Sequence, residues 1–485
     1  MNQAVKRRRQ AVKRAIVYTM MTMAVLGGTA LLVFLTLGYR FNRDSGTFSQ
    51  GGLVQFISKP SGASVTVGRA SLANKTRSKI TLNPGSYLVK MNLNGYQEWQ
   101  KNVEVKAGSV LWLNSALLVP TNPKTTVLAT LDNTSSTSFR LDGKYLALME
   151  SSKKPTLRIL TTSDGKLSED ETVTLPSALY TSGKKHRFTL GKWDADSDLL
   201  LVRHIVDKTS EWVAVSASDS TKSVLIKPQG KAMPSEVLFD PRGNDRVIIR
   251  YDNGVVRLMN LTSGEVSDPV ITNAASIALG SNWTVAYTTL ASEGTRSVGY
   301  LTLGNAKPRE IAAYSDDKPL SVAIGDYYGA TYLAVTHGKT AVVSKVRSWP
   351  ASDSSGPLST EIAYTTALAK DGIFTSFRGS GRFATFQHST VQTVYDLELE
   401  REYAVPIVNA KKTLTDKLDW LDTFHFWDDA SGYFRQYEFD GTNQAPIVKV
   451  TPGFDAAYDD SQRYLYTIGS SKDGYQLQST QMFVE

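Results

Sequence analysis

An uninterrupted apolar segment near the N-terminus constrains this chain more than any other feature. Residues 15–37 read AIVYTMMTMAVLGGTALLVFLTL and contain no charged side chain. A helix rises about 1.5 Å per residue, so a segment of this length spans roughly 30 Å, the thickness of the hydrocarbon core of a bilayer. A buried helix of a soluble protein would normally show a polar stripe at this length. The segment therefore predicts a transmembrane helix.

The charges on the two sides of this segment are unequal. Arg40 alone follows it, whereas six basic residues precede it: Lys6, Arg7, Arg8, Arg9, Lys13 and Arg14. The positive-inside rule then predicts a cytoplasmic basic tail over residues 1–14, a transmembrane helix over 15–38 and an extracytoplasmic remainder. A signal peptide is the alternative, but the apolar run exceeds the usual 7–15 residues and no A-x-A cleavage site follows. We expect a retained, single-pass anchor in the cell membrane.

Composition narrows the classes of partner. The net charge is +8, and subtracting the six basic residues of the tail leaves about +2 for the rest, too little to indicate a nucleic-acid surface. The absence of cysteine excludes disulfides, thiolate metal sites and cysteine nucleophiles. An extracytoplasmic chain without disulfides depends on packing alone, which suits large β domains and favours a bacterial envelope over a eukaryotic secretory lumen.

After the helix, residues 39–52 are polar and glycine-rich, and we interpret them as a linker that spaces the next domain from the bilayer. From Leu53 onward apolar and polar residues alternate with period two, and Gly, Pro and Asn separate the runs. This pattern predicts a small antiparallel β-sandwich of seven strands or fewer over residues 53–119. Tyr96 and Trp99 are interpreted as core residues of this sandwich, with an aromatic binding face as the alternative.

Four motifs carry a family resemblance, and they occur in this order: Pro60-Ser61-Gly62-Ala63, Leu82-Asn83-Pro84-Gly85-Ser86-Tyr87, Gly95-Tyr96 and Val103-Glu104-Val105. The segment resembles the PEGA domain, a β-sandwich module of bacterial surface proteins. It departs from the family signature at Ser61, where the signature has glutamate. The resemblance implies a surface β-sandwich rather than a catalytic domain.

The third region, residues 125–485, consists of repeating units. Each unit contains short strands separated by Asp/Gly turns, and eight units begin at Phe139, Phe188, Glu236, Ser276, Ser321, Gly372, Asp419 and Gly453. Four short strands per unit of roughly 35–50 residues predict a β-propeller of seven or eight blades, with eight preferred. The step Leu141-Asp142-Gly143-Lys144-Tyr145 resembles the repeats of TolB-like and WD-like propellers. The fold class is therefore all-β apart from the N-terminal helix.

The ends of this region predict how the propeller closes. The last unit supplies three strands before the chain ends at Glu485, and the strand TTVLATL of residues 125–131 has no partner in the first unit. We expect residues 125–131 to complete the last blade. Closure of this kind removes the unpaired strand edges that an open β array would expose.

Catalytic and metal-binding patterns are missing from the sequence. It contains no G-x-S-x-G, no H-E-x-x-H and no Gly-rich phosphate loop, and its five histidines are scattered. Asp194, Asp196 and Asp198 have the spacing of a calcium loop, but Leu199 occupies the position that requires glycine, so a polar turn is favoured. We therefore expect no catalytic residue, no cofactor and no metal ion.

Two acidic pairs, Asp428-Asp429 and Asp459-Asp460, are interpreted as turn residues at the same position of their units. Carboxylates that converge from different blades remain the alternative, because a glycosidase needs such a pair.

Aromatic residues supply the candidate ligand contacts: Trp420, Trp427 and Trp349. Trp420 and Trp427 lie near Phe424 and Phe426 in the densest aromatic cluster of the chain, and packing between blades is favoured for them. A ring of aromatic side chains at one mouth of a propeller would instead bind a sugar or a peptide. The segment 348–357, SWPASDSSGP, contains Trp349 and predicts an exposed loop suited to contact.

These observations predict a membrane-anchored extracytoplasmic binding or scaffold protein. The propeller would bind a protein or a cell-wall glycan, and the PEGA-like domain would act as a spacer. The expected partners are the membrane, an envelope protein or glycan, and further copies of this or another chain, but no nucleic acid. Two alternatives stay open: a glycan-active enzyme that uses propeller carboxylates, and a structural subunit of an envelope or surface assembly.

Overall fold

The computed structural model describes residues 3–36, 39–42, 46–183, 185–304, 307–348, 358–408 and 418–483. The chain divides into two compact units, Met1–Thr121 and Asn122–Glu485. The first unit contains the N-terminal helix and the small β-sandwich, and the second contains the repeating units. Each unit is described by itself below.

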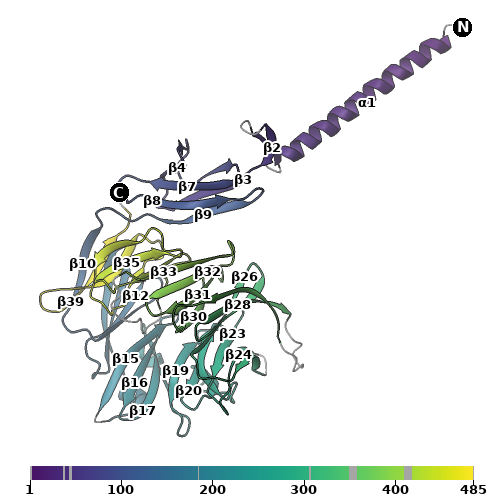
Figure 1. The fold of residues 1–485 in the computed structure, drawn as a ribbon. Coiled ribbons are helices and arrows are strands. Elements are labelled where there is room, and N and C mark those ends of the chain that lie inside the picture. The colour runs from purple at the N-terminus through teal and green to yellow at the C-terminus, as the bar shows by residue number, and fades with distance from the viewer. Residues whose placement is uncertain are drawn as a thin grey trace. The chain divides into compact units, whose positions relative to one another are not determined.

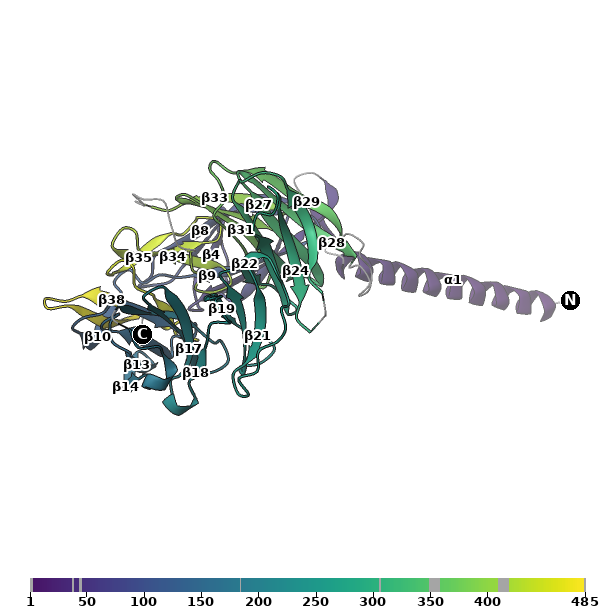
Figure 2. The same ribbon diagram turned by 90° about the horizontal axis from the view of Figure 1, so that it is seen from below.

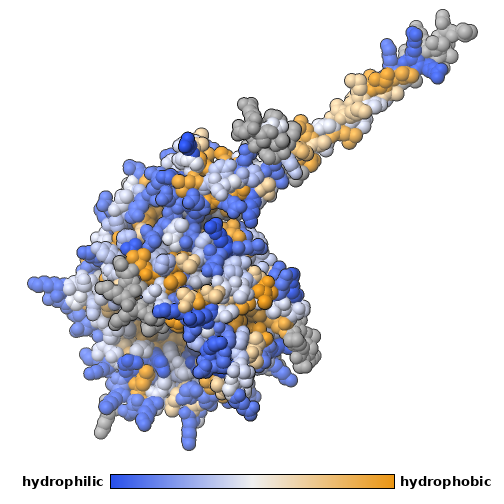
Figure 3. All heavy atoms as spheres, in the orientation of Figure 1, coloured by the Kyte–Doolittle hydropathy of each residue, from blue (hydrophilic) through white to orange (hydrophobic). Residues whose placement is uncertain are grey.

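The first element is one long helix, α1 (Gln3–Thr36), which is drawn unbroken in Figure 1. It begins within the basic segment, so the predicted tail and the predicted membrane helix share a single element. Its segment Val12–Phe34, 23 residues, is long and apolar enough to cross a membrane, and none of it is buried. Apolar side chains cover the surface of this part of the helix (Figure 3). Such a surface is stable in hydrocarbon and costly in water.

A short hairpin follows the helix, where the sequence predicts only a linker. Strands β1 (Tyr39–Asn42) and β2 (Thr47–Gln50) pair antiparallel, and Phe41 lies opposite Phe48. Aromatic residues favour strands, and here they outweigh the glycine and polar content that indicates a flexible spacer. The predicted linker thus contains a short hairpin that the sequence analysis did not anticipate.

Seven strands form the sandwich of the first unit, in the orders β6-β3-β9 and β5-β4-β7-β8. Their bounds are β3 (Gly52–Lys59), β4 (Ser64–Val67), β5 (Ala70–Ser71), β6 (Ser78–Leu82), β7 (Gly85–Asn92), β8 (Trp99–Val105) and β9 (Val110–Leu117). The prediction of a purely antiparallel sandwich is wrong in one place, because β3 and β9 pair in parallel. The chain crosses to the second sheet between these two strands and returns in the same direction.

The sandwich core contains the residues that the alternating pattern predicts. Val54 and Phe56 on β3 are fully buried, and Tyr96 and Trp99 are nearly so, which confirms that these aromatics pack in the core. Gly62 has a φ of +95°, the conformation for which the motif requires glycine. The Thr76 hydroxyl accepts hydrogen bonds of 3.0 Å from the amides of Gly62 and Ala63 and fixes this turn.

The second unit is a β-propeller in which the described residues form eight sheets, six of four strands and two of three. The sheets follow one another in sequence, and Figures 1 and 2 show them arranged around a ring. The first four sheets contain β11 (Ser136–Phe139), β12 (Tyr145–Met149), β13 (Thr156–Ser163) and β14 (Lys166–Thr174); β15 (His186–Trp193), β16 (Leu199–Val206), β17 (Thr209–Ser216) and β18 (Val224–Ile226); β19 (Pro234–Phe239), β20 (Arg246–Tyr251) and β21 (Val256–Asn260); and β22 (Ala274–Leu279), β23 (Thr284–Thr289), β24 (Arg296–Thr302) and β25 (Arg309–Tyr314).

The other four sheets contain β26 (Leu320–Tyr327), β27 (Ala330–His337), β28 (Thr340–Ser348) and β29 (Ser359–Ala367); β30 (Phe374–Arg378), β31 (Phe383–His388), β32 (Val391–Asp396) and β33 (Arg401–Pro406); β34 (His425–Asp428), β35 (Tyr433–Glu438) and β36 (Ala445–Lys449); and β37 (Ala457–Tyr458), β38 (Tyr464–Ser470), β39 (Tyr475–Gln481) and β10 (Lys124–Leu131). Two short 3-10 turns, Ser177–Leu179 and Ser220–Lys222, lie between strands. The eight sheets follow the order of the eight repeating units, and the number of blades itself stays a prediction.

The ends of the second unit meet in one sheet, as the sequence predicts. Strand β10 pairs antiparallel with β39, from Lys124 opposite Gln481 to Leu131 opposite Tyr475. The hydroxyl groups of Thr125 and Thr480 lie 3.0 Å apart across this pair. The pairing of the first strand of the unit with its last strand is therefore confirmed.

Hydrophobic clusters join each sheet to the next. Leu146 and Leu148 on β12 pack with Tyr466 and Ile468 of the closing sheet, and Leu201 on β16 packs with residues of the next sheet. The contact between β35 and the closing sheet is aromatic, since the rings of Phe434 and Tyr458 lie 6.5 Å apart. Because the neighbouring sheets cover both faces of a sheet, the sheets of this unit form a closed ring with buried apolar layers between them.

The closing strand provides a test of this architecture. Replacing Leu131 with Ala should lower the free energy of unfolding by about 2–5 kcal/mol, because this side chain is 1% exposed and lies in the cluster that joins the closing sheet to the first. Val127→Ala on the same strand is the matched control, since Val127 is 51% exposed, and it should change the stability by less than about 0.5 kcal/mol. Urea denaturation measures both. Equal effects of the two substitutions would contradict the closure.

Candidate functional site

The aromatic residues predicted as ligand contacts lie against other aromatic rings. Trp420 is 8% exposed, and its ring lies 5.8 Å from that of Phe383 and 5.6 Å from that of Phe426. Trp427 is half-buried and stacks on Phe434 at 4.9 Å. Trp420 therefore packs in a core between two sheets. Too little of its ring is exposed for it to contact a sugar or a peptide. Trp349 and the rest of the predicted loop, residues 349–357, lie outside the described residues.

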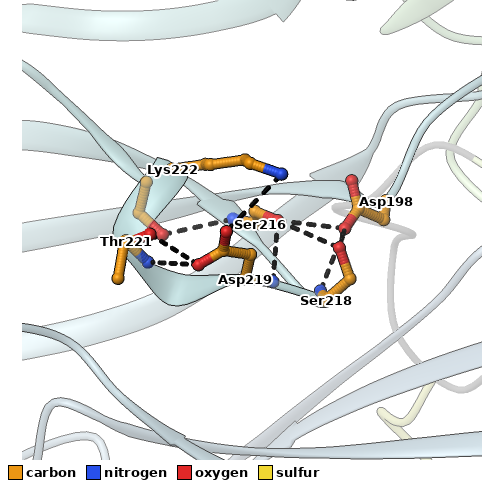
Figure 4. Close-up of polar contacts among 7 residues, drawn as sticks. Asp198, Ser216, Ser218, Asp219, Thr221 and Lys222 are labelled. Carbon is orange, nitrogen blue, oxygen red and sulfur yellow. Dashed lines mark hydrogen bonds and ion pairs between the residues drawn. The ribbon is translucent and has the colours of Figure 1, made fainter.

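Two of the three aspartates with calcium-loop spacing, Asp194 and Asp198, accept hydrogen bonds from nearby groups of the chain. Asp194 accepts a hydrogen bond of 2.6 Å from the Ser197 hydroxyl. Asp198 accepts from the Ser216 hydroxyl at 3.0 Å and the Ser218 amide at 2.9 Å, within a network of polar contacts (Figure 4). Among the described residues, no group of three or more His, Cys, Asp or Glu is placed to hold a metal ion. The interpretation of this segment as a polar turn is confirmed.

The two acidic pairs do not share one turn position, so that prediction is wrong. Trp420 forms a bridge with Phe426, which places residue 420 on the inner side of β34. Asp428 therefore follows the second strand of its unit, whereas Asp459 follows the first strand, β37. Both still act as turn residues, because Asp428 accepts from the Ala430 amide at 2.8 Å and Asp459 from the Tyr464 amide at 2.9 Å.

Two histidines that are distant in sequence lie together in the fold. Strands β15 and β16 pair, and the rings of His186 and His204 lie 5.7 Å apart. His204 is fully buried, and its Nδ1 lies 2.7 Å from a carboxylate oxygen of Glu211. Glu211 also accepts hydrogen bonds of 2.6 and 3.0 Å from the amide and hydroxyl of Thr181. Strand pairing therefore builds a buried polar network from histidines that look scattered in the sequence.

A second polar cluster gathers charges from four of the sheets. Lys192 lies on β15, Arg378 ends β30, Asp419 precedes β34 and Asp455 precedes β37. The Lys192 Nζ lies 3.5 Å from an Asp419 carboxylate oxygen, although the two residues are 227 positions apart. Two other sheets separate the sheets of β15 and β34 along the shorter way around the ring. Side chains from such distant sheets meet across the central channel. We call these two residues the channel cluster, together with Arg378 and Asp455, whose charges act on them.

Electrostatics couples the members of the channel cluster. Burial raises the pKa of Asp455 to about 6, Lys192 opposes this shift, and the charge of Asp419 adds to it. Burial alone would lower the pKa of Lys192, but Asp419 and Asp455 outweigh it and raise that pKa. Burial lowers the pKa of Arg378, and Asp419 partly offsets the effect. The cluster is therefore sensitive to any further charge that enters the channel.

Backbone contacts fix the carboxylate of Asp455. Its oxygens accept hydrogen bonds of 2.9 Å from the Phe139 amide and 3.0 Å from its neighbour Ala456. The Asp455 amide donates to the Thr137 hydroxyl at 3.1 Å. Phe139 and Thr137 lie on β11, the inner strand of the next sheet, so the junction between two sheets holds this side chain in place.

Two of the turns between first and second strands display large aromatic side chains. Trp283 is 57% exposed and Tyr328 is 86% exposed. Their turns adjoin, because the Asn282 side chain donates a hydrogen bond to Asp326. Trp283 and Tyr328 both have positive φ values, 57° and 46°. Non-glycine residues in this conformation carry backbone strain of about 1–3 kcal/mol, which is typical of functional loops.

Sequence reasoning did not find the channel cluster. Its members belong to four separate units, and no short motif links them. The sequence indicates this cluster only through the position of each residue within its repeating unit. Asp419 and Asp455 lie at or near the start of their units, and Lys192 and Arg378 lie close to the turn that ends an inner strand. A residue-by-residue alignment of the units would have placed all four on inner strands.

The PEGA domain family matches residues 53–120 of the chain. This range agrees with the resemblance that the four sequence motifs carry, and it coincides with the seven-stranded sandwich of the first unit. No curated protein matches the chain.

Several solved structures are similar to this chain at low sequence identity. The β-propeller domain of Myceliophteria thermophila Cps50 (Swd1) is 10% identical and covers 74% of this chain and 99% of its own, with a TM-score of 0.38. Dihydro-heme d1 dehydrogenase NirN is 12% identical over 68% of this chain and 76% of its own, with a TM-score of 0.44. The computationally designed Ika8 protein is 10% identical over 74% of this chain and 98% of its own, also with a TM-score of 0.44.

The raised pKa of Asp455 predicts a pH dependence of stability. The pKa of this carboxyl is about 6 in the folded protein and an ordinary 3.8 in the unfolded chain. Between these pH values the folded protein therefore binds more protons at this position than the unfolded chain does. The contribution of Asp455 to the free energy of unfolding is therefore complete below about pH 4, and it is lost as the pH rises through 6. Relative to Asp455→Asn, the wild type should lose on the order of 2 kcal/mol of unfolding free energy between pH 4 and pH 7.

Urea denaturation of the two proteins at several pH values measures this difference. Asp170→Asn is the control of opposite sign, because the hydrogen bond from Arg158 lowers the pKa of Asp170. Parallel pH profiles for wild type and Asp455→Asn would contradict the raised pKa.

Proposed function

We propose that this chain is a membrane-anchored scaffold whose propeller binds an envelope ligand, a protein or a cell-wall glycan, on the extracytoplasmic side. The observation that carries the proposal is the exposed apolar surface of α1 over Val12–Phe34, attached to two β units that need no membrane. A lipid bilayer is the environment that such a surface fits. The basic residues before it favour a cytoplasmic N-terminus.

Binding is supported by the features at one end of the propeller. Two turns that follow inner strands carry the exposed rings of Trp283 and Tyr328, and Lys192 and Arg378 lie close to the corresponding turns of their own sheets. Exposed aromatics supply large contact areas at low entropic cost, and charged groups in a channel supply specificity. The PEGA domain would act as a folded spacer between the anchor and the propeller.

A glycan-active enzyme is the second candidate, and one observation favours it. Asp419 and Asp455 come from neighbouring sheets and interact electrostatically, and the pKa of Asp455 is raised to about 6. A glycosidase uses one carboxylic acid with a raised pKa beside an ionised carboxylate. Release of reducing sugars from purified cell wall, lost in both Asp419→Asn and Asp455→Asn, would favour the enzyme over the scaffold.

Two measurements on cells test the scaffold proposal. Membrane fractionation should recover the intact chain with the lipid fraction, and protease added to whole cells with a permeable outer layer should cleave the part beyond residue 52. Intact chain in the soluble fraction would contradict the anchor, and protection of the β units from protease would contradict their external location.

Binding is tested separately with purified chain in detergent. Incubation with isolated envelope material should retain the protein on the insoluble fraction without releasing a cleaved product. The double variant Trp283→Ala/Tyr328→Ala should reduce the retained fraction at least about tenfold if these rings form part of the contact. Leu141→Ala is the control, because Leu141 is equally exposed on a turn of a distant sheet. Retention that is the same for all three proteins would contradict a contact through these rings.

A further inference from the structure

One member of the channel cluster has a buried nitrogen atom that forms no hydrogen bond with the described residues. The Nε atom of Arg378 is buried, and among the described residues it has no hydrogen-bond partner. Burial of an arginine is costly unless the guanidinium is paired, and burial lowers the pKa of Arg378 accordingly. A buried guanidinium nitrogen without a partner among the described residues is therefore a feature to explain.

The carboxylates near Arg378 already have donors. Asp419 pairs with the Lys192 Nζ at 3.5 Å. Asp455 accepts hydrogen bonds from the amides of Phe139 and Ala456. Neither carboxylate forms an ion pair with Arg378 in the part of the chain that the structure describes.

Several other arginines of the propeller form ion pairs with aspartates. Arg242 lies 2.6 Å from an Asp240 oxygen, and Arg382 lies 2.6 Å from an Asp396 oxygen. Arg140, which ends the inner strand region of its own sheet as Arg378 does, pairs with Asp142. The Nε of Arg435 also lacks a partner among the described residues, but Arg435 lies opposite Asp428 on β35, away from the inner strands. Arg378 is thus an arginine of an inner strand whose buried Nε has no partner among the described residues.

We propose that Arg378 binds the carboxylate of a ligand that enters the central channel, with the Lys192 ammonium as a second, more mobile cation. This inference rests on the proposed binding function and names the chemistry of its ligand: an acidic sugar or another small molecule with a single carboxylate. The planar fork of a guanidinium matches a carboxylate and binds it through two parallel hydrogen bonds. The ligand would supply the partner that the described residues do not.

The resident aspartates favour a ligand with one negative charge. Asp419 and Asp455 lie in the same cluster, and both raise the cost of bringing another negative charge close. A dianion such as phosphate is attracted twice as strongly by Arg378 and Lys192 but also repelled twice as strongly by the two aspartates. In a cluster with two charges of each sign, its second charge adds a desolvation cost without a net attraction. A neutral sugar gains nothing from the Arg378 guanidinium. The cluster therefore selects a monocarboxylate over both alternatives.

Isothermal titration of the full chain in detergent with sodium glucuronate tests the proposal. Glucuronate should bind, whereas glucose, which lacks the carboxylate, and inorganic phosphate should bind at least about tenfold more weakly. Arg378→Gln should weaken glucuronate binding at least about tenfold, and Arg378→Lys should restore part of it, because lysine keeps the charge but not the fork. Arg140→Gln is the matched control and should leave glucuronate binding unchanged, because Asp142 already neutralises Arg140.

Several outcomes would overturn the proposal: no heat of binding with glucuronate at millimolar concentration, equal binding of glucose, tighter binding of phosphate, or unchanged binding by Arg378→Gln. Thermal unfolding of each variant shows whether a loss of binding reflects a loss of fold, and the Arg378→Lys result stands even if Arg378→Gln is unstable. If Arg378→Gln loses no glucuronate affinity but the wild type still binds envelope material, this inference fails and the scaffold proposal stands.

Discussion

Antiparallel pairing of β10 with β39 is the contact on which the propeller depends. It joins residues at the two ends of the Asn122–Glu485 unit and leaves the closing sheet with four strands. Without it, one sheet would lose its outer strand and the cluster around Leu131 and Tyr466 would open. Ring closure also fixes where the inner strands lie, and it therefore creates the channel in which Lys192 reaches Asp419.

Local patterns in the sequence predict most of the architecture. The apolar run predicts α1, the period-two alternation with four turn motifs predicts the PEGA sandwich, and the repeating units predict the propeller and its closing strand. Each of these signals lies within a few tens of residues or in a repeat of fixed form. The features that they do not predict are also local: the β1–β2 hairpin lies within the predicted linker, and β3 pairs with β9 in parallel.

The candidate site could not be predicted from the sequence, because its residues are far apart along the chain. Lys192 and Asp419 are 227 residues apart, and their meeting depends on how many sheets lie between them around the ring. His186 and His204 look unrelated until the pairing of β15 with β16 brings their rings within 5.7 Å. Trp420 shows the converse: a dense aromatic cluster in sequence is a packed junction in the fold. Sequence composition reports which residues are present, whereas the closed ring decides which of them face one another.

In the scaffold proposal, the anchor and the two β units each have a separate role. The apolar helix fits a bilayer, the PEGA sandwich is held by its own core, and the propeller concentrates charged and aromatic side chains at one end. A rigid ring suits recognition because its loops and channel are held in place before a ligand arrives, which lowers the entropic cost of binding.

The closure of the ring can be tested directly because the chain contains no cysteine. Thr125 and Thr480 are partners in the β10–β39 register, so the double variant Thr125→Cys/Thr480→Cys brings two thiols within the reach of a disulfide. Mild oxidation should give a faster-migrating, cross-linked monomer on a non-reducing gel and raise the Tm, whereas a control pair, Thr125→Cys/Thr366→Cys, should stay reduced. Failure of the first pair to cross-link, or equal cross-linking of both pairs, would contradict a propeller closed by these two strands.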